Sequence, residues 1–234
     1  MSEMNALSGA YKAPKSGQKV KQAVIMVHGY GADGRDLMGL SDLFADHLPH
    51  AAFYAPDGPH QCEANPHGRQ WFSISNSYTD LLQVDLGQLR TVYNGMLNSV
   101  KQTAHLLTDF IKRVMIHHNL EPRKLALLGF SQGTMMSLHV GLRQPEILGG
   151  IVGFSGALVG AEKLSKEIIT KPPVILVHGS ADPLVPVISM SLAETALSEN
   201  KVPCQTHVIA DLQHGIAPEG AELGAKFLRD KLAG

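Results

Sequence analysis

The chain has 234 residues, of which 44% are hydrophobic and 18% charged, so it can build a sizeable core and is not a disordered protein. Its formal net charge is −1 and no stretch is rich in Lys or Arg, which argues against nucleic acid or an anionic membrane as a partner. The first 18 residues hold no apolar signal segment, and the two cysteines cannot form a disulfide framework. We therefore expect a cytoplasmic protein without a stable membrane anchor.

Short apolar runs predict strands buried on both faces, because most of the runs lack a regular alternation of apolar and polar residues. The predicted strands are Ala23–Val27, Ala51–Ala55, Lys124–Phe130, Gly150–Phe154, Val174–His178 and Thr206–Ala210. Apolar residues spaced three and four apart predict helices between them. These helices are Ser99–His118, Ser191–Asn200 and Ala221–Leu232. The alternation of strands and helices predicts an α/β fold with a mostly parallel sheet and helices on both faces.

The organisation along the chain is that of one domain, because no repeat and no low-complexity linker divides it. We expect a flexible N-terminal arm at residues 1–18 and a single domain at residues 19–234. The least regular segment is Asp57–Asn98, which is rich in turn residues, holds the only tryptophan, Trp71, and ends in a helix predicted around Asp80–Met96. An irregular segment of this length is more often functional than idle.

The run Lys124–Phe130 leads through Gly129-Phe130-Ser131-Gln132-Gly133 directly into helix-compatible residues. A strand that turns sharply into a helix strains the residue at the apex, and small neighbours are needed to avoid clashes. The apex side chain then stands above the sheet at the positive end of the helix. Ser131 is therefore the candidate nucleophile, and the backbone N–H of Gln132 is a candidate oxyanion donor. The motif alone also fits a tight turn with an incidental serine.

A serine hydroxyl needs a histidine as general base, and that histidine needs an acid to orient it. In folds with this strand-to-helix turn, the acid and then the histidine follow the serine along the chain. Asp182 comes just after one predicted strand and His214 just after the next. Parallel sheets bind their ligands at such carboxyl ends of strands. Asp182 is therefore the expected acid and His214 the expected base.

Other residues compete for these two roles. Asp211 is the rival acid, but it lies only three residues before His214, and a separate strand end is the better source of an orienting carboxylate. His28 and His178 lie at strand ends and could be near the site, but their places in the chain order do not fit the base. His139 falls about two turns into the helix after Ser131, where we expect it to be packed.

A second oxyanion donor is expected after the strand Ala23–Val27, where the chain continues as His28-Gly29-Tyr30-Gly31. Glycines at this position let backbone N–H groups face a substrate oxygen. The N–H of Tyr30 is the candidate, paired with that of Gln132. A plain glycine-rich turn would have the same local sequence.

With these residues, the chain resembles the phospholipase/carboxylesterase family of α/β-hydrolases, the group that includes acyl-protein thioesterases. The likeness extends from about residue 20 to the C-terminus through "VHGYGADGRDL", "APDGPHQCEANPHGRQWFSIS", "LLGFSQGTMM", "GFSGAL", "VHGSADPLVP" and "LQHGI". One departure is Tyr30, where the thioesterases carry leucine. The stretch "GPHQCEANPHGRQW" is more similar to the bacterial carboxylesterases than to the eukaryotic thioesterases.

The resemblance implies the triad Ser131, Asp182 and His214 on an α/β-hydrolase fold of about seven or eight strands, without a separate cap domain. It implies hydrolysis of carboxylic esters, with thioesters or lysophospholipids as related substrates, and it requires no cofactor and no metal. The expected partner is a small-molecule ester or acyl substrate, and a homodimer stays open. "QWFSIS" resembles the family's Trp-Phe stretch near the acyl pocket, which makes Trp71 and Phe72 candidate binding residues.

A cap is also excluded by length, because only 19 residues, Ser155–Pro173, separate the predicted strand Gly150–Phe154 from the next one. They can form a loop and a short helix. Any roof must come from the segment Asp57–Asn98, with Trp71 and Phe72, and from Leu37 and Met38 after the oxyanion loop. Those four side chains are expected to form a shallow apolar groove for short or medium acyl chains.

Several alternative functions stay open at this point. An acyl-protein thioesterase is the nearest of them, and a non-catalytic binding protein with a hydrolase fold is another. A perhydrolase or C–C hydrolase would keep the triad and change the chemistry. A metal enzyme would use the cluster of His60, Cys62, Glu63 and His67, whose spacing matches no standard zinc pattern.

Overall fold

The computed structural model describes residues 7–74, 85 and 88–233. Its centre is a seven-stranded sheet in the order β1-β3-β2-β6-β7-β8-β9. The strands are β1 (Gly9–Lys12), β2 (Gln22–Val27), β3 (Ala51–Pro56), β6 (Leu125–Phe130), β7 (Gly150–Phe154), β8 (Val174–Gly179) and β9 (Cys204–Ile209). β1 pairs antiparallel with β3, and all the other pairs are parallel. This is the mostly parallel sheet that the sequence pattern predicted, with the number of strands that the resemblance to α/β-hydrolases implied.

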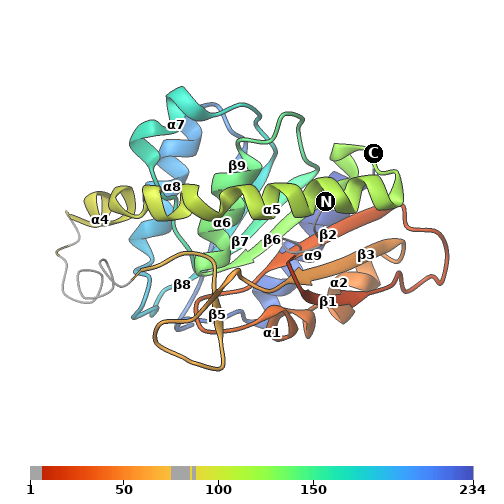
Figure 1. Ribbon diagram of the computed structural model, residues 1–234. Helices are drawn as coiled ribbons and strands as arrows, with labels where there is room; N and C mark the ends of the chain where they lie inside the picture. The colour runs from red at the N-terminus through yellow and green to blue at the C-terminus, as the bar shows by residue number, and fades with distance from the viewer. Residues whose placement is uncertain (1–6, 75–84, 86–87, 234) are drawn as a thin grey trace.

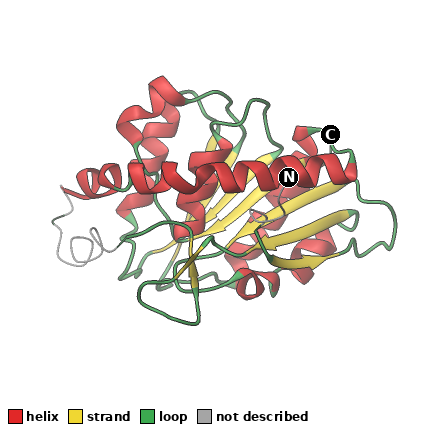
Figure 2. Ribbon diagram, in the orientation of Figure 1, coloured by secondary structure: helices red, strands yellow, loops and turns green. Residues whose placement is uncertain are grey.

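Helices cover both faces of the sheet, and the long helix α5 crosses in front of it in Figures 1 and 2. The α5 face also carries α4, α6, α7 and α8, and the opposite face carries α1, α2 and α9. The helices are α1 (Gly34–Met38), α2 (Ser41–His47), α4 (Leu89–Gly95), α5 (Leu97–His118), α6 (Gln132–Gly141), α7 (Ala161–Glu167), α8 (Ile188–Glu199) and α9 (Pro218–Leu232). A short 3-10 turn, Pro122–Lys124, precedes β6.

The central strands are apolar throughout because each of them contributes to two cores. In β2, Ala23, Ile25 and Val27 pack on the α5 side of the sheet, whereas Val24 and Met26 pack on the α9 side. A strand buried on both faces has no polar face to alternate with. The same arrangement brings the carboxyl ends of β2, β6, β8 and β9 to one edge of the sheet, where the loops that follow them meet.

The predicted strands and helices are confirmed, with ends that shift by three residues or fewer. The structure describes residues 7–18 of the segment that the sequence predicts to be a flexible arm. Gly9–Lys12 forms the edge strand β1, and the N–H of Ser16 donates to the carbonyl of Pro49 at 2.8 Å. Four residues without clear hydrophobic periodicity carry little sequence signal, and pairing with β3 decides their structure.

The segment between β3 and α5 differs most from the prediction. It contains a small hairpin, β4 (His60–Gln61) with β5 (Arg69–Gln70), that the sequence did not reveal. The helix predicted around Asp80–Met96 is present as α4, Leu89–Gly95, and the earlier part of that prediction lies largely outside the described residues. The gap between β7 and β8 holds the seven-residue helix α7 and no further domain.

Candidate active site

Ser131 lies at the turn between β6 and α6, with φ 54° and ψ −116°. This is a strained conformation for a residue with a side chain, and such strain concentrates at functional sites. The turn is possible because its neighbours are glycines: a Cβ on Gly133 would lie 1.8 Å from the carbonyl oxygen of Val27, and one on Gly129 would lie 2.4 Å from the oxygen of Gly133. The backbone N–H of Ser131 donates to Phe154 of β7 at 2.9 Å and fixes the turn on the sheet.

His214 and Asp182 meet in the loops that follow β9 and β8. The Nδ1 atom of His214 lies 2.8 Å from Oδ2 of Asp182, while Oδ1 of Asp182 accepts hydrogen bonds from the N–H groups of Leu184 and Val185, both at 2.9 Å. Asp211, the rival acid, is exposed, and its own N–H donates to the hydroxyl of Ser180. The structure thus pairs His214 with the acid that the chain order predicted.

The side chain of Asp182 is fully buried, and its charge is balanced by hydrogen bonds. Burial alone would raise the pKa of Asp182, but hydrogen bonds from His178, His214 and the backbone of Val185 outweigh it and hold the pKa below its usual range. Asp182 is therefore ionised at neutral pH. An ionised acceptor at Oδ2 fixes the proton of His214 on Nδ1 and leaves Nε2 free to accept a proton.

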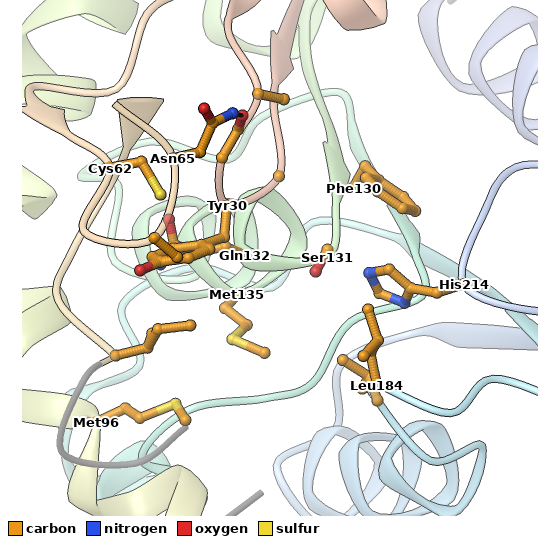
Figure 3. Close-up of a pocket in the computed structure, with 16 residues that line it drawn as sticks. Tyr30, Cys62, Asn65, Met96, Phe130, Ser131, Gln132, Met135, Leu184 and His214 are labelled. Carbon is orange, nitrogen blue, oxygen red and sulfur yellow. Dashed lines mark hydrogen bonds between the residues drawn. The ribbon is translucent and has the colours of Figure 1, made fainter. Parts of the chain in front are cut away.

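Ser131 and His214 lie at the same end of a pocket, and in Figure 3 the ring of His214 turns toward the hydroxyl of Ser131. The ring of Phe130 packs beside His214, with ring centroids 4.9 Å apart. This contact and the hydrogen bond to Asp182 together restrict the ring of His214. The nucleophile, the base and the acid are therefore gathered from three different strand ends.

The two expected oxyanion donors also border this pocket. Gln132 is the first residue of α6, so its N–H lies at the positive end of the helix and has no partner within the helix. Among the described residues, neither the N–H of Gln132 nor that of Tyr30 donates a hydrogen bond. Both groups are thus available to an oxygen at the carbon that Ser131 would attack.

The loop that carries Tyr30 is held by the irregular segment that follows β3. The indole Nε1 of Trp71 donates to the carbonyl of His28 at 3.1 Å. The side chain of Gln132 accepts from the N–H of Trp71 at 2.8 Å and donates to the carbonyl of Phe72 at 2.9 Å. Gln132 therefore offers its backbone N–H to the site and uses its side chain to fix the segment that supports the other donor.

The pocket has a volume of about 400 Å³, which is within the range of small-molecule sites. Apart from Ser131, His214 and the oxyanion loops, its lining divides into an apolar part and a more polar part. The apolar part is Ile74, Met96, Phe130, Met135, Leu184 and Val185, and the more polar part includes Tyr30, Cys62 and Asn65. Figure 3 shows Met96 and Met135 on the side of the pocket away from His214.

The four expected substrate-binding residues are not among the described residues that line this pocket. Leu37 and Met38 belong to α1 and pack into the core on the opposite face of the sheet. Trp71 and Phe72 are 0% and 1% exposed and lie behind the oxyanion loop. The expectation that these side chains form the roof of the pocket therefore needs correction. Trp71 and Phe72 support the site through their backbones, which are hydrogen-bonded to the side chain of Gln132.

The residues that line the pocket in their place differ in how far the sequence could reveal them. Met135 lies one helical turn after Ser131, so helix periodicity places it beside the nucleophile. Met96, at the junction of α4 and α5, and Ile74, after the hairpin, reach the pocket through tertiary packing and have no local signal.

The cluster of polar residues in the hairpin loop does not form a metal site. Within the described residues, no three His, Cys, Asp or Glu side chains lie where they could hold a metal ion. His60 and His67 are exposed, whereas the thiol of Cys62 is buried and borders the pocket. Across the same part of the chain, no helix combines the length and the apolar character needed to cross a bilayer.

The family model for Phospholipase/Carboxylesterase matches residues 13–232. Acyl-protein thioesterase 1 of Saccharomyces cerevisiae is 25% identical to the chain over 240 residues, covering 98% of this chain and all of that one. Esterase YpfH of Escherichia coli is 24% identical, covering 89% of this chain and 82% of that one. The crystal structure of esterase PE8 superposes with a TM-score of 0.86 at 37% identity, covering 97% and 100% of the two chains.

These matches agree with the motifs, with the seven-stranded sheet and with the geometry around Ser131. The match to the family model spans nearly the whole chain, including the three strand ends that carry the site. The chain belongs to the phospholipase/carboxylesterase family of α/β-hydrolases and is an ester-hydrolysing serine hydrolase.

Proposed function

We propose that Ser131, His214 and Asp182 form the catalytic triad of a carboxylesterase that acts on esters of short to medium acyl chains. One observation carries the proposal: His214, bonded through Nδ1 to the buried carboxylate of Asp182 at 2.8 Å, lies at the same end of a pocket as a serine on a strained turn. Strain, an oriented base and two free N–H groups are what acyl transfer requires in one place.

The proposed reaction has two halves. In the first, the hydroxyl oxygen of Ser131 bonds to the ester carbonyl carbon as its proton passes to Nε2 of His214, and the N–H groups of Tyr30 and Gln132 stabilise the oxyanion. The bond to the leaving group then breaks, and His214 returns the proton to it. In the second half a water molecule attacks the acyl-serine in the same way and releases the carboxylic acid and free Ser131.

The position of His214 determines how a substrate lies in the pocket. Because His214 must protonate the leaving group, that group has to lie at the His214 end, beside Phe130 and Leu184. The acyl chain then extends the other way, toward Met96 and Met135. Methionines accommodate varied apolar shapes, which suits an acyl chain of short or medium length in a pocket of about 400 Å³.

We favour oxygen esters over acyl-proteins as substrates, because the similarity to an esterase structure, at 37% identity, exceeds that to the yeast thioesterase, at 25%. The described cysteines, Cys62 and Cys204, are both free, which supports the cytoplasm as the place of action.

A substrate panel tests this proposal. Esters with acyl chains of increasing length are compared with the matching thioesters, and the adduct of a fluorophosphonate is located by mass spectrometry. We expect labelling of Ser131 and the highest kcat/KM on short or medium oxygen esters. A binding protein without activity would neither react nor label. Labelling of a different serine would contradict the proposed nucleophile.

The absence of a cap in the gap between β7 and β8 adds a kinetic expectation. A site without a cap in this gap is expected to work on dissolved esters, so the initial rate should saturate smoothly below the aggregation point of a partly soluble ester. A negligible rate on monomers followed by a jump on micelles would contradict an open site.

A further inference from the structure

A second histidine, His178, contacts the carboxylate of Asp182. His178 lies near the end of β8, four residues before Asp182. Its Nε2 atom lies 2.7 Å from the carbonyl oxygen of Val185 and 3.3 Å from Oδ2 of Asp182. Oδ2 is the same oxygen that His214 contacts at 2.8 Å. One carboxylate oxygen therefore faces two imidazole rings, and the proposed mechanism has used only one of them.

The proton on His178 can be placed from these contacts. A carbonyl oxygen accepts hydrogen bonds only, and an ionised carboxylate does the same. Because Nε2 faces one of each, it carries a hydrogen and donates to Val185, with Asp182 as a second, more distant acceptor. The ring of His178 is 2% exposed, so no water competes for this donor from the surface.

The contacts of His178 close a ring of hydrogen bonds around the acid. His178 donates a hydrogen bond to the carbonyl of Val185, and the N–H groups of Leu184 and Val185 donate to Oδ1 of Asp182. The loop is also pressed against the one that carries His214: a Cβ on Gly179 would lie 2.1 Å from the carbonyl oxygen of Leu212. A movement of the acid loop would therefore displace the acid from His214, and it would also move Leu184 and Val185 in the wall of the pocket.

We infer that His178 is a positioning residue for the hydrolysis, an inference that rests on the proposed triad. It fixes the loop of Asp182 through Val185 and shares Oδ2 with His214. By donating to Oδ2 of Asp182, His178 offsets part of the negative charge, which would otherwise act on His214 alone. His214 thus remains a base that gives its proton to the leaving group readily, because the imidazolium form is not held too tightly.

A further titratable group near Asp182, Tyr93, does not interfere with a test at neutral pH. Tyr93 of α4 is 3% exposed and bonds the hydroxyl of Ser189 at 2.7 Å. Burial, reinforced by the charge of Asp182, raises the pKa of Tyr93 to about 12, against an opposing effect of Ser189. Tyr93 therefore stays neutral at neutral pH.

Two amide variants separate the donor from the bulk of the ring. The amide nitrogen of His178→Gln reaches about as far as Nε2 of histidine, whereas that of His178→Asn reaches only as far as Nδ1. His178→Phe keeps the ring and removes the donor. Each variant is assayed for kcat, KM and the pH profile of kcat/KM, with active sites counted by fluorophosphonate titration and folding checked by melting temperature. Asp182→Asn is measured in parallel.

We expect His178→Phe and His178→Asn to lower kcat roughly 10- to 100-fold with little change in KM, and His178→Gln to recover most of the loss. The midpoint at which kcat/KM rises with pH should move upward by about half a pH unit in the Phe and Asn variants, because Asp182 then acts on His214 alone. If His178→Phe fails to fold, the comparison of His178→Gln with His178→Asn still tests whether the donor at Nε2 is needed.

Equal losses in all three variants with an unmoved midpoint would show that His178 only fills space. Full activity of His178→Asn would show that a donor at the position of Nε2 is not needed. Either result would overturn the inference. If Asp182→Asn is fully active, the triad itself is wrong. If Asp182→Asn is inactive while His178→Phe is unaffected, only the inference about His178 fails.

Discussion

At one end of the pocket, Ser131 and His214 are carried by the ends of hydrogen-bonded strands and fixed by close backbone contacts. At the other end, Ile74, Met96 and Met135 come from three separate segments of the chain. The first end tolerates almost no displacement: Gly133 admits no Cβ at all. The second end is formed by side chains alone, two of them flexible methionines. The chemistry is thus tied to the backbone of the sheet, whereas the choice of acyl chain depends on replaceable side chains.

The largest effect is expected at the nucleophile. Ser131→Ala should lower kcat by roughly 10⁴- to 10⁶-fold while the fold persists, because the attacking oxygen is lost and the strained turn remains possible. The loss should be similar for all esters, since each of them depends on the same attacking oxygen. Circular dichroism and melting temperature check the fold. Activity near that of the natural protein would show that Ser131 is not the nucleophile.

Asp182 should come next. Asp182→Asn should cost on the order of 10⁴-fold in kcat, because an amide cannot hold His214 in the right tautomer. Asp211→Asn, an exposed control in the neighbouring loop, should be nearly harmless. If Asp211→Asn proves the worse of the two, the acid is misassigned.

The pH dependence follows from the low pKa of Asp182, which its hydrogen bonds hold down although burial alone would raise it. The stability that this depressed pKa contributes is fully present above the pKa of an unfolded aspartate, about 3.9, and is lost as pH falls through the lower folded value. Because Asp182 stays ionised between pH 5 and pH 8, kcat/KM should rise with pH through the one ionisation expected of a histidine base. A second ionisation on the acid side would contradict an ionised Asp182.

Trp71 offers a way to sharpen the comparison, because it belongs to the irregular segment but supports the rigid end. Trp71→Phe keeps most of the ring and removes the hydrogen bond to His28. We expect kcat to fall about 10-fold with KM nearly constant, since the oxyanion loop loosens and the acyl wall does not change. Phe72→Leu, which removes no side-chain hydrogen bond, is the matched control. A change in acyl preference without a change in kcat would place Trp71 in the acyl wall after all.

The smallest effect on rate is expected at the apolar end. Met135→Ala should enlarge the pocket and shift the ratio of kcat/KM for longer over shorter acyl chains by about 10-fold, with kcat on the best ester little changed. Met38→Ala serves as a control, because Met38 packs on the opposite face of the sheet. If Met38→Ala changes acyl preference and Met135→Ala does not, the assignment of the acyl wall is reversed.

The same contrast explains what the sequence could reveal. The turn at Ser131, the chain order of Asp182 and His214 and the apolar strands each depend on a few neighbouring residues, and the fold and the site geometry were readable from them. The acyl wall was not, because Met96 and Ile74 reach it only through the packing of α4 and the hairpin. Trp71 misled the prediction for a related reason: a large aromatic residue in an irregular loop suggests a ligand, yet its indole is fully buried and bonds His28.

The register of the central sheet has a consequence for how the enzyme loses activity. β6, β7, β8 and β9 are joined without interruption by parallel pairing, so the distance from the nucleophile to its acid and base is set by the sheet and not by loop length. Such a core opens only in the global transition, whereas the short edge strand β1 can detach locally. Inactivation by heat or denaturant should therefore be cooperative, coinciding with the melting of the whole domain, and hydrogen exchange at β1 should proceed in a fully competent enzyme.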